Sequence, residues 1–334
     1  MSIAVVILNW NGERHLARFL PSVTRHTPPG VRIVVADNGS EDGSLELLAR
    51  DYPQVEVIRF DRNHGFTVGY NLALALIEAD CYVLLNSDVE VTPGWIEPLK
   101  AMLDSDPKVA AVSPKLLSWT ERASFEYAGA SGGFIDMLGY PFCRGRILST
   151  TECDRGQYDD PRPVFWASGA AMMLRGELFH RLGGFDGKFF AHMEEIDLCW
   201  RLQLAGYRIM VEPRSTVYHL GGGSLPNNSP RKIYLNYRNN MAMLYKNLPR
   251  PHRRLTLLAR MFLDMGSAAV YLLTGRFAFA SAVWRAHADY CRWKPELRAQ
   301  RAATPCVDAA RLPTIYRRSI ILRYMLGRKR FPAM

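Results

Sequence analysis

The first apolar stretch of the chain, residues 3–12, reads IAVVILNWNG. Its six leading residues are apolar and largely β-branched, which is typical of a strand buried on both faces. Three more runs of this kind follow at Val31–Ala36, Val55–Phe60 and Cys81–Leu85. Segments with helical spacing come between and after them, at Glu13–His26, Ser44–Asp51, Thr67–Ala79 and Pro93–Asp104. Strands that alternate with helices at this spacing predict a parallel sheet covered by helices.

The rest of the chain is less regular. Residues 118–164 mix glycine, aromatic and charged residues without a period, which predicts loops and short strands. Later strands are expected at Val164–Leu174, Tyr207–Val211 and Ser215–His219, and a helix at Ile196–Leu204. Beyond Pro230 we expect mostly helices, with breaks near Pro249 and Pro295.

The length and composition indicate a folded protein with two domains, or with one large domain and an appendage. The cysteine pattern suits a reducing compartment. With 334 residues the chain is longer than an average domain, and its 48% apolar and 22% charged residues exclude a disordered or fibrous protein. Its six cysteines form no Cys-x-x-Cys pair, which argues against a zinc ribbon or a disulfide scaffold. The first apolar run is short and lacks a basic leader, so we expect no secretory signal.

Positive charge is concentrated towards the C-terminus. Residues 250–334 hold 17 Lys and Arg against 4 Asp and Glu, a net of +13, which leaves −3 for residues 1–249 out of a total of +10. A basic tail of this kind favours an anionic partner, either membrane lipid or nucleic acid. Its longest apolar stretch, Leu255–Leu273, is interrupted by Arg260 and Asp264, so we expect no membrane-spanning helix.

Polar side chains follow the predicted strand Cys81–Leu85. If the chain stays extended, Asn86, Asp88 and Glu90 lie on one face at the carboxyl end of this strand, where such sheets bind ligands. A carboxylate there can hold Mg²⁺ or Mn²⁺ together with a substrate diphosphate. Asn, Ser and Asp are also common turn formers, so an ordinary turn stays open as an alternative.

Three acids, Glu194, Glu195 and Asp197, lie at the start of the helix expected at Ile196–Leu204. Acidic residues stabilise the N-terminus of a helix through its dipole, which is one explanation. Adjacent carboxylates also raise one another's pKa, which suits one of them to act as a general base. Both explanations stay open on this segment alone.

Two further segments have residues that allow close contact with a ligand. His219 ends a predicted strand just before three glycines, where the backbone bends or lies close to a neighbour. Ser168 and Gly169 open an apolar strand with small side chains, so a ligand or another backbone can approach. Each segment also has a purely structural explanation. A Walker loop and a dinucleotide fingerprint are missing, which disfavours a nicotinamide enzyme, and Ser168 stands in no Gly-x-Ser-x-Gly elbow, which disfavours it as a nucleophile.

Six short motifs occur in the order seen in family 2 glycosyltransferases. They are Val6–Gly12, Asp37–Ser40, Asn63–Phe66, Asn86–Asp88, Ser168–Ala170 and Glu194–Arg201. Over about residues 1–245 the chain resembles this family and, within it, the bacterial rhamnosyltransferase-type enzymes of cell-surface polysaccharide assembly. The resemblance implies a GT-A (Rossmann-like) α/β fold, with a mixed, mostly parallel sheet flanked by helices. The catalytic domain would cover residues 1–245, with a nucleotide-binding half at about 1–115 and an acceptor half at about 116–245. The basic, helical region would cover residues 246–334.

The resemblance also implies roles for single residues. Asp88 and His219 would hold a divalent cation, and Glu195 would deprotonate the acceptor, with Glu194 beside it. Asn86 stands where the family has the first Asp of its Asp-x-Asp motif, and Glu195 stands where it usually has Asp. The residues expected to bind the nucleotide sugar are Asn9, Asn11, Asp37, Asn63, Gly65, Phe66, Asn86, Ser168 and Gly169.

The implied reaction is the inverting transfer of one sugar from a dTDP- or UDP-sugar to a saccharide or lipid-linked saccharide acceptor. The cofactor would be Mg²⁺ or Mn²⁺. The basic C-terminal region is expected to bind an anionic membrane surface, which would place the protein in the cytoplasm at the inner face of the cell membrane. Two alternatives remain, a sugar nucleotidyltransferase and a non-enzymatic nucleic-acid-binding protein. We expect no nucleic-acid partner, because residues 1–249 are slightly acidic.

Overall fold

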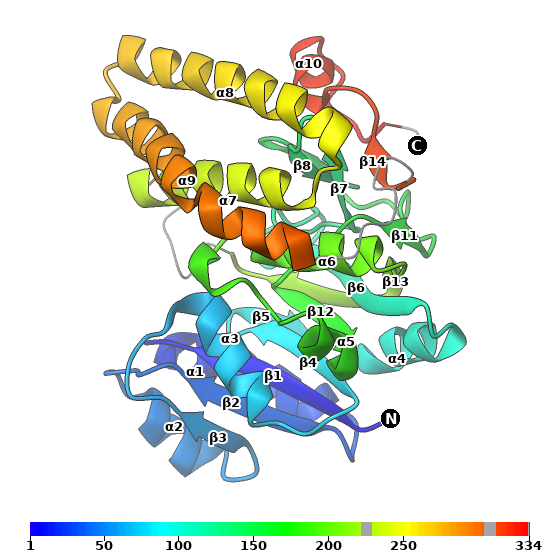
Figure 1. The fold of residues 1–334 in the computed structure, drawn as a ribbon. Coiled ribbons are helices and arrows are strands. Elements are labelled where there is room, and N and C mark those ends of the chain that lie inside the picture. Colours follow the sequence, from blue (N-terminus) through cyan, green and yellow to red (C-terminus); the bar gives the residue numbers. More distant parts are fainter. Residues whose placement is uncertain (222–228, 304–311, 333) are drawn as a thin grey trace.

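The computed structural model describes residues 1–221, 229–303, 312–332 and 334, and a nine-stranded mixed sheet lies at its centre (Figure 1). The strands are β1 (Ile3–Asn9), β2 (Arg32–Asp37), β3 (Glu56–Arg59), β4 (Cys81–Asn86), β5 (Val89–Val91), β6 (Val109–Ser118), β11 (Arg162–Val164), β12 (Ala171–Arg175) and β13 (Arg208–His219). Their order is β11-β13-β6-β12-β4-β1-β2-β3, with β5 paired to β13. Strands β4, β1, β2 and β3 are parallel to one another, and β12 joins them antiparallel to β4. The expected fold class is therefore confirmed.

Helices cover both faces of this sheet. They are α1 (Glu13–His26), α2 (Ser44–Asp51), α3 (Gly65–Ala75), α4 (Ile96–Ser105), α5 (Gly176–Arg181), a 3₁₀ turn η1 (Gly187–Phe189) and α6 (Glu194–Leu204). Along β1, Val5 and Ile7 pack in the apolar cluster formed with α1, α2 and α4, whereas Ala4 and Val6 pack in the cluster formed with α3 and α6. Burial on both faces explains why the strand sequence is apolar without alternation.

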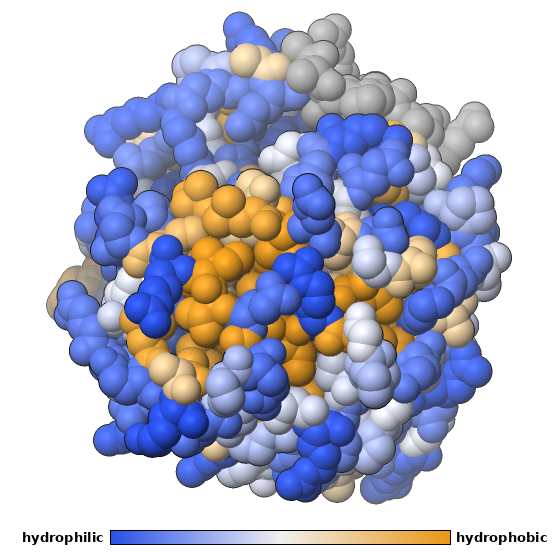
Figure 2. Space-filling model, turned by 90° about the horizontal axis from the view of Figure 1, so that it is seen from below, coloured by the Kyte–Doolittle hydropathy of each residue, from blue (hydrophilic) through white to orange (hydrophobic). Residues whose placement is uncertain are grey.

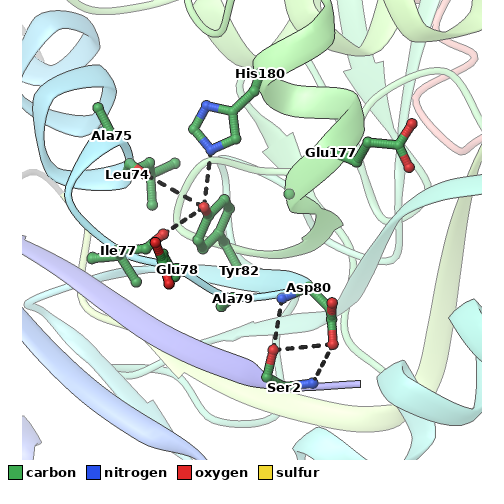
Figure 3. Close-up of a pocket in the computed structure, with 11 residues that line it drawn as sticks. Ser2, Leu74, Ala75, Ile77, Glu78, Ala79, Asp80, Tyr82, Glu177 and His180 are labelled. Atoms are coloured by element: carbon green, nitrogen blue, oxygen red, sulfur yellow. Dashed lines mark hydrogen bonds between the residues drawn. The ribbon is translucent and has the colours of Figure 1, made fainter.

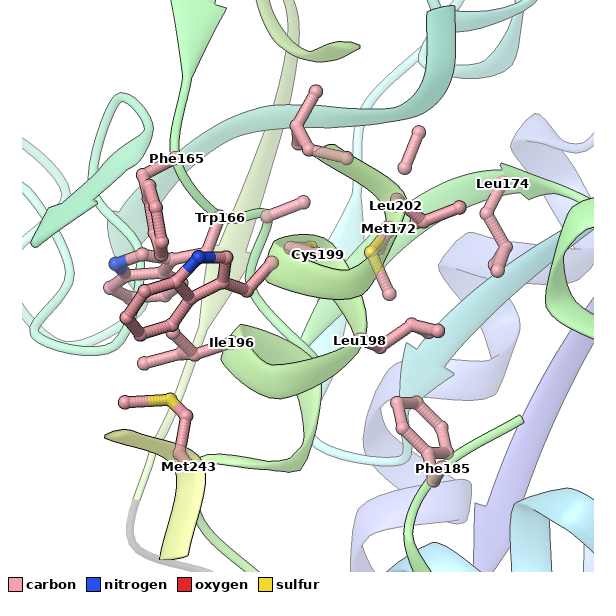
Figure 4. Close-up of a cluster of buried hydrophobic side chains, with 14 of the residues drawn as sticks. Phe165, Trp166, Met172, Leu174, Phe185, Ile196, Leu198, Cys199, Leu202 and Met243 are labelled. Atoms are coloured by element: carbon pink, nitrogen blue, oxygen red, sulfur yellow. The ribbon is translucent and has the colours of Figure 1, made fainter. Parts of the chain in front are cut away.

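Helix α6 lies deep in the larger apolar cluster. Nearly all of its residues are buried, and Ile196, Leu198 and Leu202 contact side chains from β12, from the segment after β11 and from the helices beyond (Figure 4). Phe165 and Trp200 meet edge to face, with their ring centroids 5.2 Å apart. The acids at the start of α6 are therefore attached to one of the most buried elements of the molecule.

A second, five-stranded sheet comes from two distant parts of the chain. It contains β7 (Gly133–Asp136), β8 (Pro141–Cys143), β9 (Arg146–Ile147), β10 (Thr150–Thr151) and β14 (Ile315–Tyr316), in the order β10-β9-β8-β7-β14. The short strands expected in residues 118–164 are thus confirmed. Strand β14 pairs in parallel with β7, and Phe331 packs on Phe134 and Phe142. The C-terminal region therefore returns to the middle of the chain.

The C-terminal helices are α7 (Pro230–Asn247), α8 (Arg250–Leu273), α9 (Phe277–Ala303) and α10 (Ile320–Met325). The break expected near Pro249 is confirmed. The break expected at Pro295 is wrong, because Pro295 lies inside α9 and the chain instead turns at residues 274–276, where Gly275 has a φ of 72°. Gly275 supplies a left-handed conformation that ends a helix at little cost.

Two expectations about strands need correction. Residues 164–174 form no single strand, because β11 ends at Val164 and β12 begins at Ala171. The two strands expected at 207–219 form one strand, β13, which has an irregularity between Glu212 and Thr216. Pro213 lies within this irregularity and has no N–H to donate to a neighbouring strand.

An apolar area lies on the face of the molecule shown in Figure 2, which is the lower side of Figure 1, where α2, α3 and β3 are found. Val57, Leu72 and Leu76 are exposed apolar side chains of β3, α3 and the end of α3. Charged side chains interrupt the area, and the half-exposed pair Arg32–Glu56 joins β2 to β3. Such charges discourage the edge strand from pairing with another chain.

Candidate active site

The carboxyl ends of β1, β2 and β4 meet at one edge of the sheet. Asn9 pairs in register with Asp37, and Leu8 pairs in register with Asn86. The motifs that follow these strands are therefore brought side by side, as expected for the ligand-binding edge of such a sheet.

Asn9 and Asp37 form a buried polar cluster. The Asn9 amide donates to Asp37 Oδ2 at 3.0 Å, and Asp37 also accepts the hydroxyl of Ser40 at 2.6 Å and its backbone N–H at 2.9 Å. Asn11 has a φ of 48°, and its Oδ1 accepts the N–H of Glu41 at 2.8 Å. The buried Asn9 Oδ1 has no hydrogen-bond partner among the described residues, which leaves an acceptor available at this edge.

A wall of asparagine, glycine and phenylalanine adjoins this cluster. Asn63 Oδ1 accepts the Gly65 N–H at 2.8 Å and the Asn38 amide at 3.1 Å. Gly65 has a φ of 78°, and a Cβ there would lie 2.6 Å from the ring of Phe190, so only glycine fits. The Phe66 ring packs on Tyr70, with the centroids 4.8 Å apart. Asn63, Gly65 and Phe66 thus lie together beside Asp37.

Asp88 and His219 meet although 131 residues separate them. Strand β5 pairs with the end of β13, which brings Asp88 Oδ1 to 3.1 Å from His219 Nε2. Glu126 lies on the other side of the ring, with its Oε1 3.3 Å from His219 Nδ1. Burial would raise the pKa of Asp88, but the charge and hydrogen bond of His219 outweigh it and lower the pKa. For His219, burial is outweighed by Asp88 and Glu126, which raise its pKa to about 10.

The extended chain expected over residues 86–90 is interrupted. Ser87 and Asp88 form a turn between β4 and β5, so Glu90 does not share a site with Asp88. Glu90 instead accepts hydrogen bonds from Arg122 at 2.7 Å and from the Trp119 indole at 2.9 Å. Asn86 stays at the edge, where its N–H donates to Ala170 O at 2.9 Å.

Glu194 and Glu195 begin α6 and are poorly hydrated. Burial, and next the charge of Glu195, raise the pKa of Glu194 well above its usual value. Burial raises the pKa of Glu195 to about 7. The Oε2 atom of each is buried and has no hydrogen-bond partner among the described residues. Such a pair is typical of sites that move protons.

Asp197, the third acid of the segment, has a different environment. It is fully buried, and it accepts hydrogen bonds from Arg201 at 2.8 Å, Lys246 at 2.9 Å and Asn247 at 2.8 Å. Burial alone would raise its pKa, but Lys246 and Arg201 lower it below the usual value. Asp197 is therefore an ionised structural residue that joins α6 to α7.

Gly169 connects the two halves of the site. A Cβ at Gly169 would lie 3.4 Å from the Phe66 ring and 3.9 Å from Glu195 Cβ, so this glycine lies between the Phe66 wall and the acidic pair. The neighbouring Ser168 hydroxyl donates to Ala128 O and accepts the Ala170 N–H at 3.2 Å. Ser168 thus holds two loops together, and the small residues keep the space above them open.

Asn38, Ser40 and Glu126 belong to this site but were not predicted as site residues. Asn38 and Ser40 lie in the same turn as Asp37, so the turn was visible in the sequence but their individual bonds were not. Glu126 lies in the segment without a period, and no sequence signal marked it.

A hollow at the opposite edge of the sheet contains none of the predicted site residues (Figure 3). Ser2 and Asp80, which precede β1 and β4, line it together with Tyr82 and His180. The Tyr82 hydroxyl donates to Ile77 O at 2.8 Å and lies 2.9 Å from His180 Nε2. Because ligands of these sheets bind at the carboxyl ends of the strands, this hollow is not the candidate site.

Residues 4–138 match the family model described as Glycosyl transferase family 2. An N-acetylglucosaminyl-diphospho-decaprenol L-rhamnosyltransferase of Mycobacterium tuberculosis is 29% identical over 233 residues, which are 65% of this chain and 75% of that protein. The expected resemblance to family 2 glycosyltransferases of the rhamnosyltransferase type is confirmed.

Solved structures share the fold. S. aureus TarS 1-349 in complex with UDP-GlcNAc has a TM-score of 0.59 at 17% identity, and the match covers 98% of this chain and 92% of that one. The mannosyltransferase PcManGT from Pyrobaculum calidifontis, in complex with GDP-Man and Mn²⁺, has a TM-score of 0.53 at 15% identity and covers 98% and 88%. At this level of identity the match supports the GT-A fold alone.

Proposed function

We propose that the protein is an inverting glycosyltransferase that moves one sugar from a dTDP- or UDP-sugar to a hydroxyl of a lipid-linked saccharide, in the assembly of a cell-surface polysaccharide. L-Rhamnose is the first donor sugar to test, because the M. tuberculosis relative is named as a rhamnosyltransferase with a diphospho-decaprenol acceptor. The observation that carries this proposal is the placement of Gly169 between the Phe66 wall and Glu195. The family match favours glycosyl transfer over the nucleotidyltransferase alternative.

The donor nucleotide is assigned to the carboxyl ends of β1 and β2. Asp37 supplies an acceptor for the single N3–H of a thymine or uracil base, and the free Oδ1 of Asn9 supplies a further acceptor in the nucleotide pocket, with Asn11 at the same edge. Asn63 and Gly65 shape the wall, and Phe66 covers the nucleoside with its ring. The sugar lies towards a second group of residues, which contains Asn86, Ser168 and Gly169.

A divalent cation fits beside Asp88 and His219. A carboxylate oxygen and an imidazole nitrogen 3.1 Å apart suit Mn²⁺ or Mg²⁺, which would take the place of the proton that His219 Nε2 shares with Asp88. Glu126 beside the far nitrogen would orient the ring as outer carboxylates commonly do. Among residues 1–221, 229–303 and 312–332, no three His, Cys, Asp or Glu side chains converge to hold a metal by themselves. Diphosphate and water oxygens would therefore complete the shell. When bound, the cation offsets the charge that develops on the leaving diphosphate.

Glu195 is the proposed base. Glu194 is 5% exposed, and burial together with the charge of Glu195 raises its pKa well above its usual value, which favours its protonated form. Glu195 is less buried and lies beside Gly169, where the acceptor meets the sugar. The acceptor hydroxyl loses its proton to Glu195 as its oxygen attacks the anomeric carbon, and the bond to the diphosphate breaks on the opposite face. The configuration is inverted, and the enzyme needs no nucleophile.

A screen of nucleotide sugars tests this function. We expect one dTDP- or UDP-sugar to raise the melting temperature in the presence of Mn²⁺ and to be transferred to a lipid-linked saccharide. Asn9→Ala should lose the thermal shift, whereas Glu195→Gln should keep it and lose transfer. A protein that neither binds nor hydrolyses any nucleotide sugar in the screen would contradict the proposal.

The proposed second partner is an anionic membrane surface, which would place the protein at the inner face of the cell membrane. Helix α8 is the outermost helix at the top of Figure 1. By length and composition His252–Leu273 could cross a membrane, and only 17% of its most apolar window is buried. The exposed apolar side chains of α8 are Leu255, Leu258, Phe262, Leu263, Val270, Leu272 and Leu273.

Two charged residues in the middle of α8, Arg260 and Asp264, point inward. Arg260 is 3% exposed and donates to Asn240 Oδ1 at 2.7 Å and to Leu138 O at 3.0 Å. Asp264 is fully buried and lies 3.1 Å from the Nε2 of His287 on α9. A helix whose polar side faces the protein and whose apolar side faces outward suits an apolar exterior. Because Arg260 and Asp264 are already used inside, α8 can lie in the membrane surface but would have to leave its partners to cross it.

Co-sedimentation with liposomes tests this partner. Phe262→Asp is expected to release the protein from anionic vesicles, because Phe262 is 79% exposed on α8. Leu76→Asp is the matched control, since Leu76 is 67% exposed and follows α3, which lies in the lower half of Figure 1, away from α8. Binding should need anionic lipid and weaken with salt. Equal loss in both variants, or no binding by the wild type, would contradict a membrane role for α8.

A further inference from the structure

The segment that leads into the acidic pair is held in an unusual backbone conformation. Phe190, His192 and Met193 have φ values of 66°, 70° and 72°. Side chains other than glycine rarely adopt this region, and such residues persist only where neighbouring structure holds them. Three residues with positive φ lie within four positions, directly before Glu194. Contacts from neighbouring elements must therefore hold the backbone of this segment in its conformation.

One side chain makes most of the contacts that impose this shape. Asn239 of α7 is fully buried, and its amide donates to the backbone oxygens of Phe189 at 2.9 Å, Ala191 at 2.9 Å and His192 at 2.8 Å. On the opposite side, Phe190 O accepts the N–H of Phe66 at 3.0 Å. The segment is thus fixed between α7 and the wall proposed for the nucleoside.

The position of the acidic pair depends on this segment. Helix α6 has Met193 as its N-terminal cap, and no side chain caps it. The direction of its first turn, which carries Glu194 and Glu195, therefore follows from the preceding backbone. A change in the φ angles of residues 190–193 would move both carboxylates relative to Gly169.

We propose that Asn239 is a positioning residue for the acidic pair, acting through the backbone of residues 189–192. This role rests on the proposed function of Glu195. The effect of the three Asn239 hydrogen bonds on the backbone of residues 189–192, which we call the clamp, can be measured without any assay of sugar transfer. A purely structural role would lower stability and leave the catalytic step of the folded enzyme unchanged.

Variants of Asn239 test the role against a matched control. Asn239→Ala removes all three contacts, Asn239→Asp keeps the shape but cannot donate, and Asn239→Ser keeps one donor. Asn71 is the control, because its side chain also clamps a backbone, bonding Phe185 O at 2.8 Å and Phe185 N at 2.9 Å, before the strained segment begins. With the folded fraction matched by melting curves, Asn239→Ala and Asn239→Asp should lose roughly 100-fold in kcat, as expected for a misplaced catalytic group. Their KM for the donor should change less than about threefold.

Amide hydrogen exchange is the second readout. Exchange at residues 190–195 should rise in all three Asn239 variants and stay at the wild-type rate in Asn71→Ala. The proposal is overturned if this exchange is unchanged in Asn239→Ala, if kcat is unchanged, or if Asn71→Ala loses as much kcat. A wild type that transfers no sugar would refute the proposed function alone. The exchange measurement would still show whether Asn239 holds the backbone before Glu194.

Discussion

Glu194 and Glu195 are neighbours in sequence but have different tasks in our proposal. Glu195→Gln keeps the size of the side chain and removes the proton acceptor, so we expect turnover to fall by roughly 10²–10⁴-fold. Glu194→Gln should be much milder, because burial and the charge of Glu195 raise the pKa of Glu194 and favour its protonated form, which glutamine resembles. Steady-state transfer at saturating donor measures both. If Glu194→Gln is the crippled variant, the two assignments must be exchanged.

The raised pKa of Glu195 predicts a specific pH dependence. A base acts in its ionised form, and burial raises the pKa of this carboxyl to about 7. Activity should therefore rise with pH with a midpoint at about 7 and level off about one unit higher, whereas an exposed glutamate would reach its plateau near pH 5.5. The acidic limb of kcat against pH measures this. A limb centred below about pH 5 would contradict the buried environment assigned to Glu195.

Glu126 gives a prediction about metal binding that no sequence motif contains. Asp88→Ala should abolish transfer, and EDTA should do so reversibly. Glu126→Gln should keep the fold but weaken Mn²⁺ by about 10–100-fold, because the carboxylate behind a ligating histidine orients its ring. The Mn²⁺ concentration for half-maximal activity measures this. Full activity of metal-stripped enzyme, or an unchanged Mn²⁺ requirement in Glu126→Gln, would contradict the site.

Individual residues of the candidate active site could be predicted from the sequence where they belong to short local motifs. Asn9 and Asp37 follow apolar strands, and parallel neighbours bring their carboxyl ends together by geometry alone. The meeting of Asp88 with His219 across 131 residues came only from the family resemblance, because pairing of β5 with β13 has no local signal. Glu126 was missed for the same reason.

At the scale of elements, α6 and α7 are joined by buried charges. Lys246 is 5% exposed and lies 2.9 Å from both Asp186 and Asp197. Lys246→Met should lower the free energy of unfolding by about 3–5 kcal/mol, because it leaves two buried carboxylates short of a partner. Lys188→Met, which breaks the half-exposed pair with Glu296, should cost less than about 1 kcal/mol. Denaturant unfolding measures both, and equal losses would contradict the buried network.

Element boundaries followed local chemistry closely in the first part of the chain. Helix α1 covers Glu13–His26 as predicted, because its apolar face and its flanking turn residues agree. Pro295 was misleading, since a proline can be tolerated inside a long helix that is held by tertiary packing. The inward direction of Arg260 and Asp264 on α8 could not be predicted, because a sequence does not show which side of a helix faces the protein.

At the scale of the whole molecule, the C-terminal region does not behave as a separate tail. Helix α7 packs along α9, and Phe331 is part of the aromatic cluster of the second sheet. Removal of residues 250–334 should therefore lower the melting temperature or cause aggregation, because it exposes apolar surface of α7. Thermal denaturation of the truncated protein checks this. A truncated protein as stable as the full chain would show that the helices are dispensable.

The pairing of β14 with β7 has a consequence for synthesis. Ile315 pairs with Ile135, so the two strands leave the ribosome 180 residues apart. At about 5–20 residues per second, the edge of β7 waits on the order of 10–40 s for its partner. During that wait an unpaired edge is free to join another nascent chain. The yield of soluble protein should therefore depend on how quickly the ribosome translates the 180 residues that separate the two strands.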